Sequence, residues 1–182
     1  MKVLTTRLAG LLVIEPDVHA DTRGFFLETF RRDSYAAAGV DAELVQDNHS
    51  RSVRGTLRGL HFQVGPGQAK LVRVARGTVL DVAVDVRRRS PSFGQFEAVE
   101  LDDAHHRQFY VPVGFAHGFC VLTDEADVVY NVSSYYDPAL ERGVAWNDPE
   151  IGIRWPVAAP FLSERDARNP RLAEIVGELP DW

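Results

Sequence analysis

Short segments rich in β-branched or aromatic residues recur along most of the chain, each bounded by Gly, Pro, Asp or Asn. This pattern is typical of β-strands. Because the segments follow one another at close spacing, the sequence predicts a mainly-β sandwich or barrel. The expected strands are residues 11–15, 25–30, 43–47, 70–75, 78–86, 96–101, 108–111, 118–122 and 127–132.

The expected strand over residues 80–86 has two different faces. Its even-numbered positions are all apolar, whereas Asp81, Ala83 and Asp85 share the other face. Acidic residues repeated on one strand face are typical of solvent exposure, so we expect this face to contact water. The alternative is that Asp81 lines a polar barrel interior. Residues 87–92, which begin with three arginines, are expected to form a solvated turn, with an anion-binding patch as the alternative.

Helix signals are few. Asp33 as a capping residue, helix formers after it and Gly39 as a stop predict a short helix over residues 33–38. A second short helix is predicted near the carboxy terminus. There Asn169 is the expected cap, Pro170 the first helical position and Gly177 the end.

Length and composition indicate one soluble globular domain, residues 1–182. A chain of this length buries one good core, and 45% hydrophobic with 25% charged residues is ordinary for such a domain. The formal net charge of −6 argues against binding to a nucleic acid polymer or an anionic membrane. No apolar run approaches the ~20 residues needed to cross a bilayer, and the amino terminus lacks a signal-peptide core. We therefore expect a cytoplasmic protein.

Two segments resemble the paired half-motifs of the cupin barrels. Residues 55–61 run from a glycine to His61, and residues 112–117 combine proline, glycine and His117 at a second fixed spacing. The resemblance implies that, in metal-binding cupins, the first half-motif supplies His-x-His and then Glu as metal ligands. Here Gln63 replaces the second His, and Lys70 stands roughly where the Glu belongs. Because a divalent ion would lose two ligands and face an ammonium, we expect no metal and no other cofactor.

The same residues favour proton chemistry. Residues two apart on a strand share a face, so His61 and Gln63 are expected to point into the barrel. With Arg58, Lys70 and His117 nearby, a barrel interior needs extensive pairing or an anionic, oxygen-rich ligand, because unpaired buried charge is very costly. Taken alone, His61 could instead be a satisfied core residue.

Such a set suits proton transfer at a carbon next to a carbonyl. His61 would act as the base, particularly if a carboxylate holds its other ring nitrogen. Lys70 would stabilise the enolate oxygen without metal. Inversion also requires an acid on the opposite face, and Tyr130 has the strand parity to point inward. The alternative for Tyr130 is an aromatic of the core or rim.

From residue 6 to residue 166 the chain resembles the dTDP-4-dehydrorhamnose 3,5-epimerases, which are sugar-nucleotide epimerases of deoxysugar biosynthesis. The matching stretches are specific to this family because of their order and their number. These are residues 21–28, 46–50, 58–63, 68–73, 81–87, 90–94, 112–119, 130–137, 146–149 and 162–166.

The resemblance implies a role for each matching residue. His61 would be the base, Asp166 its orienting carboxylate, Lys70 the partner of the enolate oxygen and Tyr130 the acid. The implied substrate-binding residues are Arg23, Phe26, Glu28, Gln46, Asn48, Arg58, His117, Phe119 and Tyr136. Among these, Tyr136 and Phe26, or its neighbour Phe25, would hold the thymine ring. The alternatives are a surface ion pair for Arg23 and a helix cap for Asp166.

The resemblance also implies an assembly. Members of this family are homodimers of cupin-type jelly-roll subunits, in which an amino-terminal segment, here about residues 1–30, crosses to the partner's sheet. Arg23 and Phe26 would then act in the neighbouring subunit's pocket.

The expected function is cofactor-independent inversion of C3 and C5 of dTDP-4-dehydro-6-deoxy-D-glucose, giving dTDP-4-dehydro-β-L-rhamnose. Within the same class, the alternative is a single-position epimerase of a dTDP-4-keto-6-deoxy sugar for an antibiotic or surface sugar. From other classes, the alternatives are a metal-dependent cupin oxygenase or isomerase and a catalytically silent nucleotide-sugar binding protein.

Overall fold

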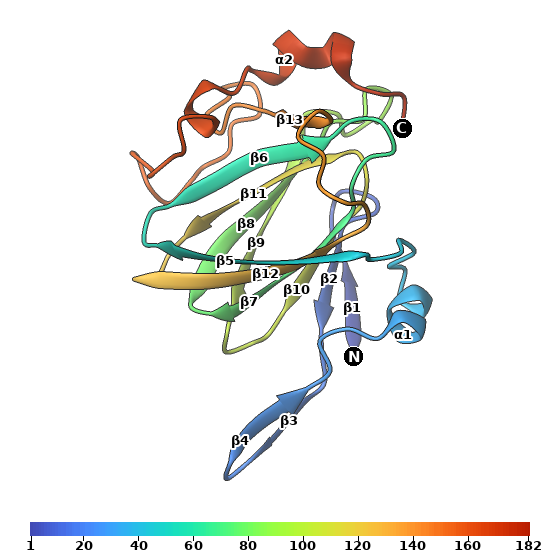
Figure 1. Ribbon diagram of the computed structural model, residues 1–182, viewed down its shortest axis with the longest axis vertical. Coiled ribbons are helices and arrows are strands. Elements are labelled where there is room, and N and C mark those ends of the chain that lie inside the picture. The colour runs from blue at the N-terminus through green and yellow to red at the C-terminus, as the bar shows by residue number, and fades with distance from the viewer.

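The structure is a computed structural model that describes residues 1–182, and it is built from two facing antiparallel sheets (Figure 1). The six-stranded sheet has the order β1 (Lys2–Thr5), β2 (Leu12–Glu15), β10 (Gln108–Val111), β7 (Lys70–Arg76), β12 (Glu125–Val132), β5 (Gln46–Val53). The five-stranded sheet has the order β13 (Glu141–Gly143), β6 (Leu57–Gln63), β11 (Phe115–Val121), β8 (Thr78–Asp85), β9 (Phe96–Asp102). The predicted mainly-β fold is confirmed.

Helices are short and lie outside the sheets. They are α1 (Arg32–Ala37) and α2 (Leu172–Ile175), with 3₁₀ turns η1 (Asp166–Arg168) and η2 (Val176–Glu178). None of them is long and apolar enough to cross a membrane. The helix α1 covers the outer face of the six-stranded sheet, and α2 covers the outer face of the five-stranded sheet (Figure 1).

Both predicted helices exist, but their caps differ from the expectation. α1 begins at Arg32, so Asp33 lies in its first turn. α2 begins at Leu172, two residues after Pro170. The reason is that Asp148, rather than Asn169, accepts the Leu172 N–H at 2.8 Å.

The core lies between the sheets and continues under the carboxy-terminal segment. Apolar residues of both sheets, among them Val72, Phe109 and Phe119, fill the interior. A second cluster packs the outer face of the five-stranded sheet against α2 and the residues after it. Strand β8 is therefore buried on both faces.

This double burial explains a wrong prediction. Asp81 and Asp85 are fully buried rather than solvent-exposed. Asp81 faces the interior, as the alternative reading held, and Asp85 accepts hydrogen bonds from Arg87, Ser90 and Ser92. The turn that follows β8 is accordingly braced by this buried carboxylate and is not simply a solvated loop.

Several strands lie where the hydrophobic pattern is weak. The pattern predicted residues 43–47 and 25–30, but β5 runs over Gln46–Val53 and β4 (Gly24–Leu27) ends earlier. β5 was placed wrongly because it is a sheet edge whose inward residues are also polar. The short strands β1, β13 and β3 (Val18–Asp21) were missed altogether, and the hydrophobic pattern also did not predict β6 as a strand.

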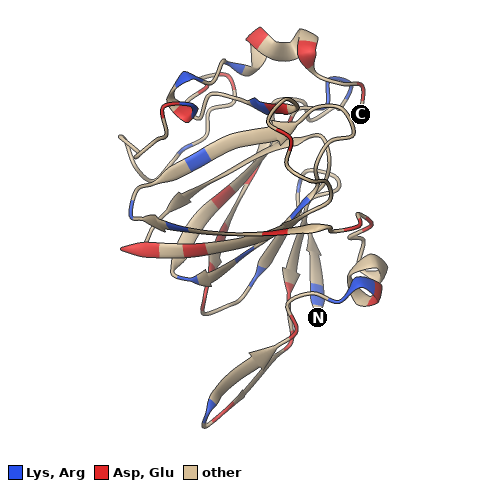
Figure 2. Ribbon diagram, in the orientation of Figure 1, with Lys and Arg blue, Asp and Glu red and all other residues tan.

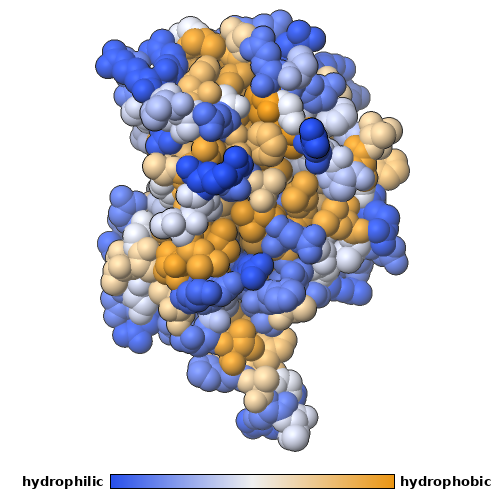
Figure 3. Space-filling model, turned by 180° about the vertical axis from the view of Figure 1, so that it is seen from behind, coloured by the Kyte–Doolittle hydropathy of each residue, from blue (hydrophilic) through white to orange (hydrophobic).

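Strands β3 and β4 form a hairpin that projects away from the body of the molecule (Figure 1). Charged residues lie at its tip (Figure 2), where Arg23 pairs with Asp21. Phe25 and Phe26 are largely exposed, Phe26 to 70%. The opposite view shows apolar side chains at the surface of the body and at the root of the hairpin (Figure 3).

Candidate active site

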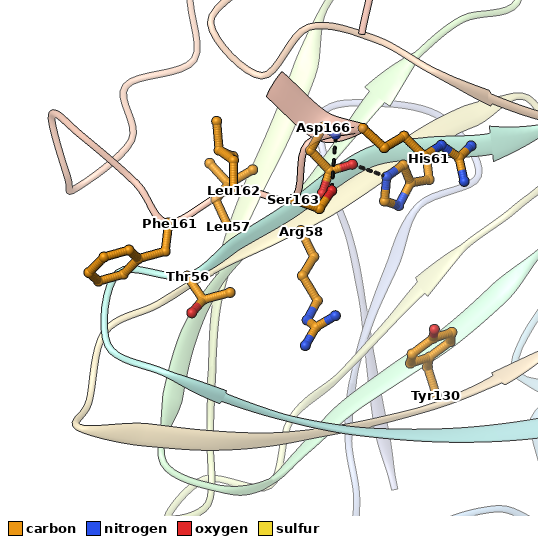
Figure 4. A pocket seen from close by; sticks show the side chains of 10 residues that line it. Thr56, Leu57, Arg58, His61, Tyr130, Phe161, Leu162, Ser163 and Asp166 are labelled. Atoms are coloured by element: carbon orange, nitrogen blue, oxygen red, sulfur yellow. Dashed lines mark hydrogen bonds and ion pairs between the residues drawn. The ribbon is translucent and has the colours of Figure 1, made fainter. Parts of the chain in front are cut away.

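A cavity of about 480 Å³ opens between the two sheets beside β6. One wall comes from β6, another from β12, and the third from the segment that leads into η1 (Figure 4). The lining residues are Thr56, Leu57, Arg58, His61, Tyr130, Phe161, Leu162, Ser163, Arg165 and Asp166.

A bulge in β6 places Arg58 and His61 on the same wall. His61 pairs with His117 of β11, and Arg58 pairs with Phe119, so three steps along β6 match two along β11. Such an irregularity re-aims the side chains on either side of it. Residues that strict alternation would point in opposite directions therefore both face the cavity.

His61 and Asp166 form a hydrogen-bonded pair. His61 Nε2 lies 2.5 Å from Asp166 Oδ1, and Ser163 Oγ accepts the Asp166 N–H at 3.0 Å. Burial raises the pKa of Asp166, but hydrogen bonds from His61, Ser163 and the Gly59 N–H outweigh it and bring the pKa below its usual range. The ionised carboxylate accepts a hydrogen bond from the Nε2–H of His61, which leaves Nδ1 of His61 free to act as a base.

Tyr130 faces this pair from the other sheet. It lies on β12, lines the same cavity and packs partly into the core between the sheets. Burial raises the pKa of its hydroxyl, with Glu141 adding to the increase and Arg58 opposing it. The phenol is therefore protonated at neutral pH and is a proton donor across the cavity from His61.

Lys70 lies behind the cavity wall. Its side chain is 7% exposed, and Nζ is 3.5 Å from the backbone oxygen of His61. Burial lowers the pKa of Lys70 to about 8, although Glu141 and Asp81 oppose the change. The ammonium is thus buried close to two carboxylates and to the backbone of His61.

A second His–carboxylate pair lies next to the first. His117 Nε2 is 2.7 Å from Asp81 Oδ1, and both side chains are buried. The second oxygen of Asp81 has no partner. Phe119, two residues on, is a core residue between the sheets. Neither His117 nor Phe119 lies on the cavity wall itself.

Three residues expected at the nucleotide end are close together. Gln46 donates to Asn48 Oδ1 at 2.8 Å and accepts the Tyr136 N–H at 3.0 Å. The Tyr136 hydroxyl donates to Glu141 at 2.7 Å, and Arg165 forms an ion pair with the same carboxylate. Gln46, Asn48 and Tyr136 therefore form a group next to the Glu141–Arg165 ion pair.

Glu141 and Arg165 were not singled out from the sequence. Arg165 lies within the matching stretch 162–166 and lines the cavity, so its position beside Asp166 was a usable signal. Glu141 lies on the three-residue edge strand β13, for which the hydrophobic pattern gives no indication.

The structure does not bring Arg23, Phe26 and Glu28 to the cavity of their own chain. Arg23 and Phe26 are on the hairpin, and Glu28 follows it, with all three exposed. The Arg23 side chain is 89% exposed and pairs with Asp21.

No group of three or more His, Cys, Asp or Glu side chains is arranged to hold a metal ion. His61 and His117 bond two different carboxylates, and Gln63 accepts the Asp137 N–H at 3.3 Å.

A His–Asp pair that faces a tyrosine across a cavity between two antiparallel sheets is the arrangement expected for a cupin-type sugar-nucleotide epimerase, and the comparisons with known proteins agree. A family model described as dTDP-4-dehydrorhamnose 3,5-epimerase matches residues 5–174. The chain belongs to this family. The cupin-type jelly roll predicted from the sequence is confirmed, because the solved relatives of this chain share the fold along its whole length.

Individual relatives match nearly end to end. The dTDP-4-dehydrorhamnose 3,5-epimerase of Shigella flexneri is 47% identical over 96% of this chain and 97% of its own. The dTDP-4-dehydrorhamnose 3-epimerase of Streptomyces niveus is 45% identical over 100% of this chain and 90% of its own. The structure of the dTDP-6-deoxy-D-glucose-3,5-epimerase of Legionella pneumophila in complex with dTDP-4-keto-L-rhamnose has a TM-score of 0.96. It is 44% identical and covers 100% of this chain and 98% of that one.

Proposed function

We propose that the protein inverts C3 and C5 of dTDP-4-dehydro-6-deoxy-D-glucose, without a cofactor, to give dTDP-4-dehydro-β-L-rhamnose. The observation that carries this proposal is the His61–Asp166 pair on one cavity wall with Tyr130 on the facing sheet. A base and an acid on opposite sides of one cavity are what inversion at a carbon requires.

His61 starts each inversion. Its Nδ1 takes the proton from the carbon next to the 4-ketone, the C–H electrons move into the enolate, and the carbonyl oxygen becomes negative. Asp166 stabilises the imidazolium that forms, because its ionised carboxylate accepts a hydrogen bond from Nε2–H.

Lys70 supplies positive charge for the enolate oxygen from the interior side, and His117, buried against Asp81 next to the cavity, supports the sugar end from behind the wall. Tyr130 then gives its hydroxyl proton to the carbon from the opposite face, which forms the new C–H bond and leaves a phenolate. Proton exchange with solvent returns His61 and Tyr130 to their starting states.

The nucleotide is held mainly outside the reacting end of the cavity. Gln46, Asn48 and Tyr136 lie together there, toward the Gln63 end of β6, and Arg58 lies on the cavity wall at the other end of that strand, beyond His61. The chain supplies no further aromatic from its own hairpin, since Phe26 is exposed and does not line the cavity.

We therefore propose a homodimer in which each hairpin enters the neighbouring subunit's site. Phe26 would stack on the thymine opposite Tyr136, and Arg23 and Glu28 would contact the nucleotide, Arg23 through its planar donor fork. Phe119 supports the pocket from the core. The proposed location is the cytoplasm, and we propose no nucleic acid polymer or membrane as a partner, in keeping with the net charge of −6.

A single-position epimerase is the second candidate, because the 3-epimerase of Streptomyces niveus matches the whole chain at 45% identity. The 3,5-epimerases of Shigella flexneri and Legionella pneumophila match it equally well, and the latter holds dTDP-4-keto-L-rhamnose. We favour inversion at both carbons.

The test is the identity of the product. The purified protein is incubated with dTDP-4-dehydro-6-deoxy-D-glucose, NADPH and a 4-ketoreductase that accepts the L-configured ketosugar. We expect dTDP-L-rhamnose and stoichiometric oxidation of NADPH. A product inverted only at C3 would support the second candidate, and no product would overturn both.

A further inference from the structure

Ser52 links the two sheets at the wall of the cavity. It lies on β5, in the six-stranded sheet, and is 6% exposed. Its Oγ accepts a hydrogen bond from Nε of Arg58, which lies on β6 in the five-stranded sheet, at 3.0 Å. Arg58 forms no other side-chain hydrogen bond within the chain.

This bond fixes how the Arg58 guanidinium is turned. Arg58 extends from β6 toward the sheet that carries Tyr130 (Figure 4). With Nε bonded to Ser52, both terminal amino groups are without a partner in the chain and face the cavity. Because the guanidinium is planar, tying Nε sets the direction of the remaining donors.

The orientation of Arg58 matters for the acid. The Tyr130 hydroxyl forms no hydrogen bond within the chain, and the charges that act on it are Arg58 from β6 and Glu141 from β13. His61, Asp166 and Arg165 line the same cavity. When Tyr130 gives up its proton it becomes a phenolate, and a fixed positive charge facing it stabilises that state.

We propose that Ser52 is a positioning residue for inversion: it holds Arg58 against the second sheet so that the guanidinium supports proton donation by Tyr130. This inference rests on the proposed function. It concerns the step after deprotonation, in which the carbanion either receives a proton from Tyr130 and inverts or takes one back from His61 and does not.

Ser50 provides a matched control. It lies two residues before Ser52 on the same strand and the same face, and its Oγ is buried with no hydrogen-bond partner. Ser50→Ala therefore removes a hydroxyl of the same kind from the same wall without releasing Arg58.

The experiment measures partition in deuterium oxide. Wild type, Ser52→Ala, Ser50→Ala and Ser52→Thr are each given the ketosugar nucleotide, and NMR compares deuterium in uninverted substrate with the amount of inverted product. This ratio is set within the bound complex, so a change in substrate affinity alone does not alter it.

We expect Ser52→Ala to raise the ratio of exchange to inversion about tenfold, as the loss of one charge-assisted hydrogen bond implies. Ser50→Ala should match wild type, and Ser52→Thr, which keeps the hydroxyl, should restore the ratio. If Ser52→Ala does not fold, Arg58→Lys tests the same link, because it keeps the charge and lacks Nε.

A ratio in Ser52→Ala, or in Arg58→Lys, equal to that of Ser50→Ala would overturn this inference while leaving the proposed function intact. Absence of both exchange and product in the wild type would instead mean that the proposed function is wrong.

Discussion

Asp166 Oδ1 lies 2.5 Å from Nε2 of His61, although the two residues are 105 positions apart in the chain. The backbone explains how they meet. Phe161 exchanges hydrogen bonds with the chain at the start of β6, donating to the Gly55 carbonyl at 2.9 Å and accepting the Leu57 N–H at 3.0 Å. The segment that carries Asp166 is thereby pinned to the strand that carries His61.

Asp166→Asn should reduce kcat by about 10³-fold, which is within the range for a general base that loses its support. The amide cannot stabilise the imidazolium as a carboxylate does, and it can turn so that the proton moves to Nδ1. Steady-state kinetics at neutral pH measure the loss. Asp181→Asn is the control, because Asp181 pairs with Arg88 and lies outside the cavity. Equal activity of the two variants would contradict the proposed role of Asp166.

Lys70 should give kcat/KM, which reports the groups of the free enzyme, an alkaline limb with a midpoint near pH 8. Burial lowers its pKa to about 8, and only the ammonium stabilises an enolate, so activity falls as pH rises through that value. The hydroxyl of Tyr130 does not interfere, because its pKa lies above the ordinary value.

Asp81→Asn should shift the midpoint of this alkaline limb in a direction that the structure predicts. Asp81 raises the pKa of Lys70, so its neutralisation should move the midpoint to lower pH. The comparison is kcat/KM against pH for the wild type and the variant. A midpoint that stays in place or moves to higher pH would show that Lys70 does not control the limb.

Gly118→Ala should destabilise the protein by about 1–3 kcal/mol, because a methyl group there overpacks the contact between β11 and β6. A Cβ on Gly118 would lie 2.7 Å from the Arg58 carbonyl and 3.0 Å from Gly59 Cα. Urea unfolding measures the change in the free energy of unfolding. Gly177→Ala is the control, since nothing lies within 4 Å of its Cβ position. A stability loss no larger than that of the control would argue against close packing at the bulge.

The proposed dimer predicts complementation between two inactive variants. Arg23→Ala and His61→Asn are expected to lack most activity when expressed separately. In a mixed dimer with exchanged hairpins, one site keeps both its own His61 and the partner subunit's Arg23. Random pairing should then restore about one quarter of wild-type activity. If each hairpin served its own subunit, co-expression would restore nothing.

The sequence predicted most inner strands well, β6 excepted, and the edge strands poorly, except for β9. β10 was located at its true bounds and β8 nearly so, because their apolar residues are buried in the core. β5 and β13 are edge strands with polar residues, and periodicity carries little information there. Asp81 was misread because strand parity reports which residues share a face and does not report what covers that face.

Some residues of the site could be predicted from the sequence and others could not. His61 and Tyr130 were found from strand patterns together with the cupin and family motifs, and the structure brings them to one cavity. Asp166 depended on the family resemblance alone, since no local pattern links residues so far apart. Ser52 and Glu141 become visible only when the two sheets are placed together, because each acts through a contact with a residue on the other sheet or an adjacent loop.

The most direct measurement is NMR of dTDP-4-dehydro-6-deoxy-D-glucose with the purified protein in deuterium oxide, read separately at C3 and C5. We expect deuterium at both carbons with the wild type and at neither with His61→Asn. Deuterium at one carbon only would make the protein a single-position epimerase. If the wild type introduces deuterium at neither carbon, proton transfer by His61 and Tyr130 is not the function of this site.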